Sequence, residues 1–211
     1  HLLEAELDAK VGLIGTNGNM IGDEFLHSEH TTPESYELHK LFREMADAGC
    51  THVVMEVSSH SLTLERVAGI MFDVAVFTNL SQDHLDFFGT MDNYLAAKKL
   101  LFSAGMARNA AVNVDEETAK AVCDSLDCPL LTYGISGKAD LFARDIEITE
   151  TGVSFTLNLR NLHAERVHLL LTGMFNVYNA LAAAACKLFG LTQEQTANAL
   201  GLAGTQSCGL W

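Results

Sequence analysis

The sequence predicts an α/β fold in which helices flank a mostly parallel sheet that carries a small antiparallel extension. As far as residue 133, short apolar runs alternate with helical patterns, which is typical of a parallel sheet. After Gly137, three segments alternate apolar and polar residues with no helix between them, which indicates antiparallel strands. An apolar fraction of 48% in 211 residues is normal for a globular protein with a real core.

A strand, a turn-rich loop and a helix open the chain. The strand covers residues 10–15 and the loop residues 16–22. We predict that Thr32 is the helix N-cap, with Pro33 at the first helical position and Gly49 after the last turn. The apolar stripe of this helix consists of Leu38, Leu41, Phe42 and Met45.

Strands and helices continue to alternate through the middle of the chain. We predict strands at 51–55, 72–78, 110–114 and 130–133, and helices from about 59, at 91–102 and at 116–126. The 51–55 strand, rich in β-branched residues, is predicted to be buried. The antiparallel strands are placed at 142–148, 152–159 and 167–171, followed by helices at 176–188 and 193–200.

Charge and cysteine usage exclude several classes of protein. The net charge of −14, from 13 basic and 27 acidic side chains, argues against a nucleic-acid-binding surface. The five cysteines are scattered and form no CxxC pair, which indicates a reducing compartment and no structural zinc. There is neither a signal peptide nor an apolar run long enough to span a membrane. We therefore expect a cytoplasmic protein with no nucleic-acid partner and no membrane insertion.

The glycine-rich stretch at residues 12–20 imitates a phosphate-binding loop. Such a loop needs a Lys for the terminal phosphates and a Ser or Thr for magnesium, followed by a helix. Asn19 and Met20 occupy those two places, and residues 22–27 are a poor helix. We therefore predict a structural role for this stretch.

Three polar residues at or beyond predicted strand ends suggest a cation and phosphate site. Glu56 and His84 fall at or after the ends of two strands, where ligands bind in open α/β sheets. Lys98 lies on the helix that follows. Each also has a simpler interpretation: a carboxylate at a helix N-terminus, a packed or surface histidine, and a solvated lysine. Neighbouring carboxylates, Asp83 and Asp86, are placed to orient the His84 ring.

Lys98 has flanking alanines that leave room for a tight site. A desolvated lysine loses its proton more readily, and a neutral amine reacts with carbon dioxide. The resulting carbamate is an anionic oxygen ligand suited to magnesium. The stretch Ser58-Ser59-His60 lacks a Gly-x-Ser-x-Gly elbow, which argues against hydrolase chemistry.

Together these residues resemble the Mur ligases, and the resemblance extends to about residue 204. The matching motifs are Thr31-Thr32-Pro33, Met55-Glu56-Val57-Ser58-Ser59-His60, Phe77-Thr78-Asn79-Leu80, Asp83-His84-Leu85-Asp86, Ala96-Ala97-Lys98 and Gly173-Met174-Phe175-Asn176-Val177-Tyr178-Asn179. The resemblance implies the P-loop NTPase-like central, ATP-binding domain of that family. It places the true phosphate loop one helix before the 10–15 strand. We therefore expect residues 1–204 to be an incomplete central domain without that loop, residues 205–211 an irregular end, and the C-terminal ligase domain absent.

The resemblance also implies a reaction. ATP phosphorylates the terminal carboxylate of UDP-N-acetylmuramoyl-L-alanyl-D-glutamate, and the amino group of L-lysine or meso-diaminopimelate attacks the acyl phosphate. The implied cofactors are ATP and Mg²⁺, and the implied partners are the UDP-N-acetylmuramoyl dipeptide and the amino acid. We expect these 211 residues alone to be inactive. Two alternatives stay open: a folylpolyglutamate synthase-like ligase, and a non-catalytic relic that binds a nucleotide sugar.

Site residues follow from the matching motifs. Glu56 resembles a ligand of a first magnesium, and His84 with carbamylated Lys98 would serve a second; these three are the predicted catalytic residues. The residues placed at the UDP-muramoyl peptide are Thr31, Thr32, Ser58 and Arg66. Asn113 and Asn179 fall near the ATP-binding positions. The departures from the family pattern are Leu64, Phe88 and Met174.

Overall fold

The computed structural model describes residues 3–4, 8–159 and 164–185, which form two compact units. The four-stranded unit contains the described residues up to 71 together with 82–106. The six-stranded unit contains residues 72–81 and the described residues from 107 onward. No helix among these residues is long and apolar enough to cross a membrane. The predicted helix at 193–200 and the predicted irregular end lie outside the described residues.

The four-stranded unit has a mixed sheet in the order β3-β2-β1-β4. Its strands are β1 (Val11–Gly15), β2 (Gly18–Ile21), β3 (Glu24–Leu26) and β4 (His52–Met55). β1 pairs antiparallel with β2 and parallel with β4. The glycine-rich stretch is thus a β-hairpin whose turn is Thr16-Asn17, closed by the pair Gly15 and Gly18. A strand, β2, rather than a helix follows this turn, unlike in a phosphate-binding loop. The predicted loop at 16–22 is wrong in that most of it is strand.

Helix α2 (Ser35–Asp47) buries Leu38, Leu41 and Met45. The helix ends as predicted: Gly49 has a φ of +84°, and the Cys50 N–H donates to the Met45 carbonyl at 2.9 Å. This pattern satisfies a carbonyl that the helix itself leaves without a partner.

The predicted N-cap of α2 is wrong. Glu34 occupies the cap position without a side-chain cap bond, and Pro33 precedes it. The Thr32 hydroxyl is engaged elsewhere: it donates to the Glu56 carbonyl at 2.9 Å and accepts from the Ser58 N–H at 3.0 Å. A long-range contact therefore competes with the local cap and wins.

β4 is less buried than predicted. The exposed fractions of Val53 and Val54 are 40% and 49%. In the described residues β4 pairs only with β1 and is the edge strand of its sheet. Its β-branched composition indicates a strand correctly, but composition does not say on how many sides a strand is covered.

After α2, the described residues of this unit also form α3 (Ser59–Thr63), α4 (Leu85–Phe88), α5 (Met91–Lys99) and the 3₁₀ helix η1 (Leu100–Phe102). α5 and η1 together cover the predicted helix at 91–102, whereas α4 was not predicted. Ser58 caps α3 by accepting from the Ser61 N–H at 3.1 Å. Thr90 caps α5 in the same way through the Asn93 N–H.

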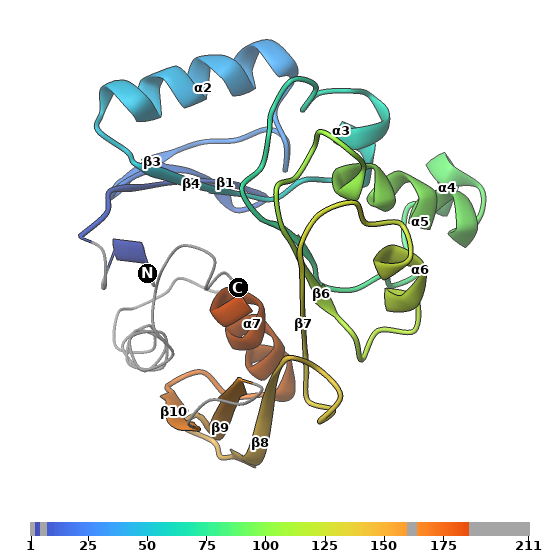
Figure 1. Cartoon of the computed structure of the whole chain (residues 1–211). Coiled ribbons are helices and arrows are strands. Elements are labelled where there is room, and N and C mark those ends of the chain that lie inside the picture. Colours follow the sequence, from blue (N-terminus) through green and yellow to red (C-terminus); the bar gives the residue numbers. More distant parts are fainter. Residues whose placement is uncertain (1–2, 5–7, 160–163, 186–211) are drawn as a thin grey trace. The chain divides into compact units, whose positions relative to one another are not determined.

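The six-stranded unit has the strand order β10-β9-β8-β7-β6-β5 (Figure 1). Its strands are β5 (Ala75–Phe77), β6 (Ala110–Asn113), β7 (Leu130–Gly134), β8 (Leu141–Ile148), β9 (Val153–Leu159) and β10 (Glu165–Leu169). β5 to β8 pair in parallel, and β8 to β10 pair antiparallel. The predicted parallel sheet with an antiparallel extension is confirmed here, although the strands of the whole described chain form two sheets rather than one.

Helices α6 (Ala119–Cys123) and α7 (Met174–Ala185) belong to the six-stranded unit. α6 is shorter than the predicted 116–126 helix. α7 contributes Val177 and Leu181 to a core that includes Tyr133, Phe155 and Leu157. This core fixes the position of α7 relative to β7, β8 and β9, which matters because α7 carries residues of the pocket described below.

Candidate functional site

Glu56 follows β4 directly, and its carboxylate is held by the turn of the β1–β2 hairpin. Its backbone N–H continues the pairing of β4 with β1 by donating to the Ile14 carbonyl at 2.9 Å. Oε2 accepts from the Thr16 N–H at 3.3 Å and from the Thr16 hydroxyl at 2.6 Å. The Thr16 hydroxyl also lies 3.0 Å from that of Thr31. The structure thus connects two predicted site residues, Glu56 and Thr31, through Thr16.

Thr32, Ser58 and Arg66 form a second connected group beside Glu56. The Thr32 hydroxyl bridges the Glu56 carbonyl and the Ser58 N–H, and Arg66 Nη1 donates to the Thr32 carbonyl at 3.1 Å. Arg66 Nη2 also pairs with the Glu34 carboxylate at 2.5 Å. Because Thr32 is 1% exposed, its hydroxyl acts on the backbone of its neighbours and is not presented to a ligand.

His84 begins α4 in a left-handed conformation, with a φ of +54°. Its N–H donates to Asp83 Oδ1 at 2.7 Å, and its Nε2 lies 3.6 Å from Asp83 Oδ2. The rings of His60 and Tyr94 meet the His84 ring edge-on, with centroids 4.9 and 6.0 Å away. Asp83 therefore neighbours the ring as predicted; the side chain, 46% exposed, remains accessible.

Lys98 lies one helical turn after Tyr94 on α5, with Nζ 5.2 Å from the centroid of that ring. Burial lowers the pKa of the Lys98 ammonium because the charged form loses hydration. The ring face of Tyr94 attracts a cation, so it opposes this effect. Tyr94 in turn stacks on Phe88, which is 8% exposed, so this departure from the family pattern is a packed residue. Tyr94 thus neighbours both His84 and Lys98.

The chemistry of these side chains fits magnesium at one position. Mg²⁺ prefers oxygen ligands and is often held by one or two carboxylates with substrate phosphates completing the shell. Glu56 offers such a carboxylate. Both hydrogen bonds from Thr16 go to Oε2, so the lone pairs of Oε1 can coordinate a cation. In the part of the chain that the structure describes, no three His, Cys, Asp or Glu side chains converge on a common metal position. A carbamate on Lys98 would add oxygen ligands to the second predicted position, near His84.

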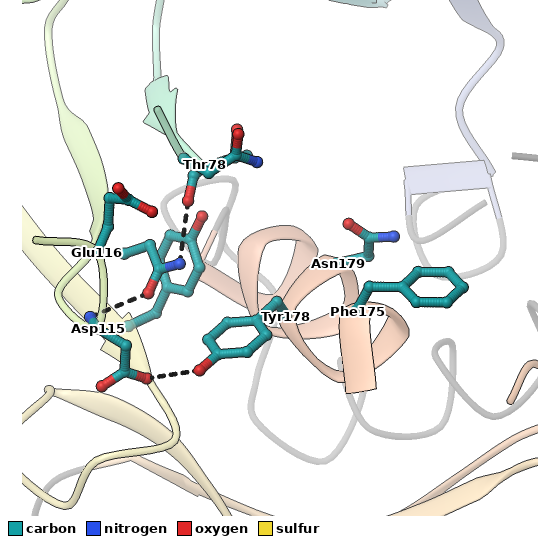
Figure 2. Close-up of a pocket in the computed structure, with 9 residues that line it drawn as sticks. Thr78, Asp115, Glu116, Phe175, Tyr178 and Asn179 are labelled. Carbon is teal, nitrogen blue, oxygen red and sulfur yellow. Dashed lines mark hydrogen bonds between the residues drawn. The ribbon is translucent and has the colours of Figure 1, made fainter. Parts of the chain in front are cut away.

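A pocket of about 320 Å³ lies in the six-stranded unit, at the ends of β5, β6 and β7 and against α7 (Figure 2). Its lining residues are Thr78, Asn79, Asn113, Asp115, Glu116, Tyr133, Phe175, Tyr178 and Asn179. Asn113 bridges two of its walls: Nδ2 donates to the Thr78 carbonyl at 3.0 Å, and Oδ1 accepts from the Asp115 N–H at 3.1 Å. Both residues predicted near ATP, Asn113 and Asn179, line this one pocket.

Asp115 ties the pocket walls together. Oδ2 accepts from the Ile135 N–H at 2.6 Å and from the Tyr178 hydroxyl at 3.1 Å, and Figure 2 shows Tyr178 pointing toward it. Burial and then the Asp115 charge raise the pKa of Tyr178 to about 12, so the phenol stays a donor at neutral pH. Aromatic faces with side-chain amides and carboxylates suit a ligand that has a flat ring and hydroxyl groups.

The sequence pattern missed several of these residues. Tyr94 precedes Lys98 by four positions on a predicted helix, a spacing that places two side chains on one face. Tyr178 and Asp115 lie one and two positions from predicted residues in the chain, but their mutual contact joins segments 63 positions apart. Thr16 lies in the glycine-rich stretch, for which the sequence predicts only a structural role.

Comparison with known proteins gives consistent results. The family model for the Mur ligase middle domain matches residues 1–187. The chain is 45% identical over 192 residues to UDP-N-acetylmuramoyl-L-alanyl-D-glutamate--2,6-diaminopimelate ligase 1 of Clostridium acetobutylicum, covering 90% of this chain and 39% of that protein. It is 46% identical over 209 residues to the ligase named for the same two substrates in Corynebacterium glutamicum, covering 95% and 40%. The chain thus spans about two-fifths of the length of these curated relatives.

Solved structures agree. A structure of UDP-N-acetylmuramoyl-L-alanyl-D-glutamate--2,6-diaminopimelate ligase superimposes with a TM-score of 0.86 at 29% identity, covering 94% of this chain and 42% of that one. The MurF ligase of Thermotoga maritima in complex with ADP shares the fold, with a TM-score of 0.64 at 19% identity over 93% of this chain and 44% of that one. Together with the family match, these likenesses confirm the predicted resemblance: the chain belongs to the Mur ligase family and corresponds to its middle domain.

Proposed function

We propose that this chain is the nucleotide-binding and phosphoryl-transfer part of a ligase that joins UDP-N-acetylmuramoyl-L-alanyl-D-glutamate to a diamino acid in peptidoglycan synthesis. The relatives named above carry 2,6-diaminopimelate in their names, which favours that amino acid over lysine. Their names also argue against a folylpolyglutamate synthase-like ligase. The observation that carries the nucleotide part is the pocket of the six-stranded unit, where both predicted ATP residues occur together.

In this proposal the reaction proceeds through an acyl phosphate. The terminal carboxylate of the dipeptide takes the γ-phosphoryl group of ATP, and ADP leaves. The amino group of the diamino acid then attacks the acyl carbon and loses a proton, and phosphate leaves as the amide forms. Phosphoryl transfer needs positioning and charge stabilisation more than covalent help from the protein. Bound Mg²⁺ supplies that charge stabilisation on the transferring group. We assign Glu56 as a ligand through its carboxylate, and Thr31, Ser58 and Arg66 as contacts of the dipeptide.

Lys98 has a separate role in the proposal. Its lowered pKa increases the fraction of neutral amine, the form that attacks carbon dioxide. Carbamate formation turns a cation beside Tyr94 into an anionic oxygen ligand. His84, whose ring also contacts Tyr94, is the neighbouring candidate ligand.

A chimera tests the proposal, since the chain covers only part of its relatives. The segment of the Clostridium acetobutylicum ligase that aligns with this chain is replaced by residues 1–187, and ligation of diaminopimelate to the UDP-dipeptide is measured by product formation. We expect the chimera to ligate, and the same chimera with Glu56→Gln to lose ligation while still binding ADP in calorimetry. Glu44→Gln, which changes an exposed carboxylate on α2, is the matched control and should ligate normally.

Two results would contradict the proposal. A chimera that binds ADP as tightly as the parent enzyme but forms no product would favour the non-catalytic relic. A folded chimera that binds no ADP would remove the nucleotide role of the pocket.

A further inference from the structure

The turn between β1 and β2 has no part in the chemistry above, yet it meets the Glu56 carboxylate on two sides. Thr16 donates two hydrogen bonds to Oε2. Gly15 lies against the other oxygen: a Cβ at Gly15 would be 2.8 Å from Oε1 and 3.1 Å from Cδ. A side chain at position 15 would therefore displace the carboxylate.

These contacts restrict a side chain that is otherwise free to move. Glu56 is exposed, and an exposed glutamate loses rotamer entropy when it takes one orientation. Here the hydrogen bonds from Thr16 favour one orientation of the carboxylate before any ligand binds, and the absence of a side chain at Gly15 leaves room for it. Pre-ordering of a ligand group reduces the cost of binding, and partners one shell out from a metal typically change metal affinity by 10- to 100-fold.

The hydroxyl chemistry gives the contact between Thr16 and Thr31 a direction. A carboxylate only accepts, so the single hydroxyl proton of Thr16 is donated to Glu56. The Thr16 oxygen can then only accept from the Thr31 hydroxyl, 3.0 Å away. The chain of donors therefore runs from Thr31 through Thr16 to Glu56, and a change at Thr31 reaches the carboxylate.

We propose that Thr16 is a positioning residue which, together with the absence of a side chain at Gly15, holds the Glu56 carboxylate ready for a divalent cation. The proposal rests on the role of Glu56 as a metal ligand. It assigns the glycine-rich hairpin a task different from phosphate binding: the hairpin orients the carboxylate of a neighbouring strand. In this proposal Thr16 acts on the cation only through the Glu56 carboxylate.

The test measures the affinity of the 211-residue chain for Mn²⁺ alone, from the electron paramagnetic resonance signal of the free ion. Thr16→Val removes the hydroxyl at constant shape, Thr16→Ser restores it, and Gly15→Ala pushes the carboxylate away. Thr132→Val is a matched control because Thr132 also donates its N–H and its hydroxyl to one carboxylate oxygen, in the other unit. Gly137→Ala is the second control, and Glu56→Gln defines loss of the site.

We expect Thr16→Val and Gly15→Ala each to weaken Mn²⁺ binding roughly tenfold or more, with Thr16→Ser within about twofold of wild type and both controls unchanged. A simple structural role would instead lower the thermal unfolding midpoint of Thr16→Val and Thr132→Val alike and leave Mn²⁺ affinity untouched. Gly15→Ala keeps the test decisive if Thr16→Val fails to fold, because the φ of Gly15 is not positive and only a flexible side chain must move.

The two ways to fail are distinct. If Glu56→Gln abolishes Mn²⁺ binding while Thr16→Val and Gly15→Ala bind like wild type, the positioning role is wrong and the proposed metal role of Glu56 survives. If Glu56→Gln binds Mn²⁺ as wild type does, the metal role itself is wrong and the positioning role falls with it.

Discussion

The polar side chains of the two units differ in their hydrogen bonding and in their exposure to solvent. In the six-stranded unit, the pocket residues Asn113, Asp115 and Tyr178 are already hydrogen-bonded to one another or to the backbone. In the four-stranded unit, Glu56 and His84 are exposed and Lys98 is half-buried against the ring of Tyr94. The hydrogen bonds to Glu56 reach only one of its two carboxylate oxygens. The pocket of the six-stranded unit therefore presents groups whose hydrogen bonds fix their orientation, whereas the four-stranded unit presents ionisable side chains that are open to solvent or only partly buried.

The largest effect expected from this division is on Glu56. In the chimera, Glu56→Gln should lower the rate of ligation by about 100-fold or more, because electrostatic stabilisation of a charged transition state is lost. The affinity for ADP should stay within about twofold, since the pocket is in the other unit. Product formation and calorimetry measure the two quantities. An equal loss of ligation rate and of ADP affinity would contradict the assignment of nucleotide binding and charge stabilisation to different units.

Lys98→Met should lower ligation roughly tenfold or more if the carbamate is a ligand. Lys99→Met is the matched control on the same helix and should not change the rate. Mass analysis after methyl esterification of the carbamate should find one carbon dioxide on the wild-type chimera and none on Lys98→Met. Absence of the adduct from the active wild-type chimera would contradict the carbamate assignment.

The same lysine predicts a pH dependence of stability. Because burial lowers the folded-state pKa of Lys98, the unfolded state binds more protons between the folded and the ordinary pKa, and stability rises with pH in that window. Lys98→Met should therefore be more stable than wild type at neutral pH, with a difference that shrinks as pH approaches the ordinary lysine pKa. Urea unfolding at several pH values checks this. A difference that grows with pH would contradict the burial effect.

A matched pair of strand substitutions compares the packing of the two units. Val112→Thr on β6 places a hydroxyl where the side chain is fully buried, and should lower the free energy of unfolding by about 1–3 kcal/mol. Val54→Thr on β4, at 49% exposure, should change it by less than about 0.5 kcal/mol. Urea unfolding of both variants measures the two changes in free energy. Equal losses would contradict the exposure of the Val54 side chain.

Tyr178→Phe should lower the free energy of unfolding by about 1 kcal/mol, because one hydrogen bond to Asp115 is lost. The folded-state pKa of Tyr178 is raised to about 12, so its stabilising contribution is complete below the unfolded pKa and is lost as pH rises through the folded value. The stability difference between wild type and Tyr178→Phe should therefore vanish at strongly alkaline pH. A difference independent of pH would assign the loss to packing alone.

Much of the fold could be predicted because local patterns specify it. The parallel β5–β7 strands, the antiparallel β8–β10 strands and the Gly49 end of α2 all follow from periodicity and from a residue with an unusual backbone conformation. Glu56, His84 and Lys98 were found because they stand at strand ends or within ordered motifs. Their roles remain predictions, as does the extent of the domain to residue 204.

The sequence alone determined the family, the secondary structure around each motif and the set of candidate residues, because each of these depends on short segments of the chain. Only the tertiary structure decided which side chains meet. The Thr32 hydroxyl donates to the Glu56 carbonyl and does not cap a helix. Thr16 donates to Glu56, which is 40 positions away in the chain. Among the described strands, β4 lies at the edge of its sheet. The physical reason is that a hydroxyl or a strand edge has several possible partners of similar energy. Which one it takes depends on segments that are distant in the chain and become neighbours only when it folds.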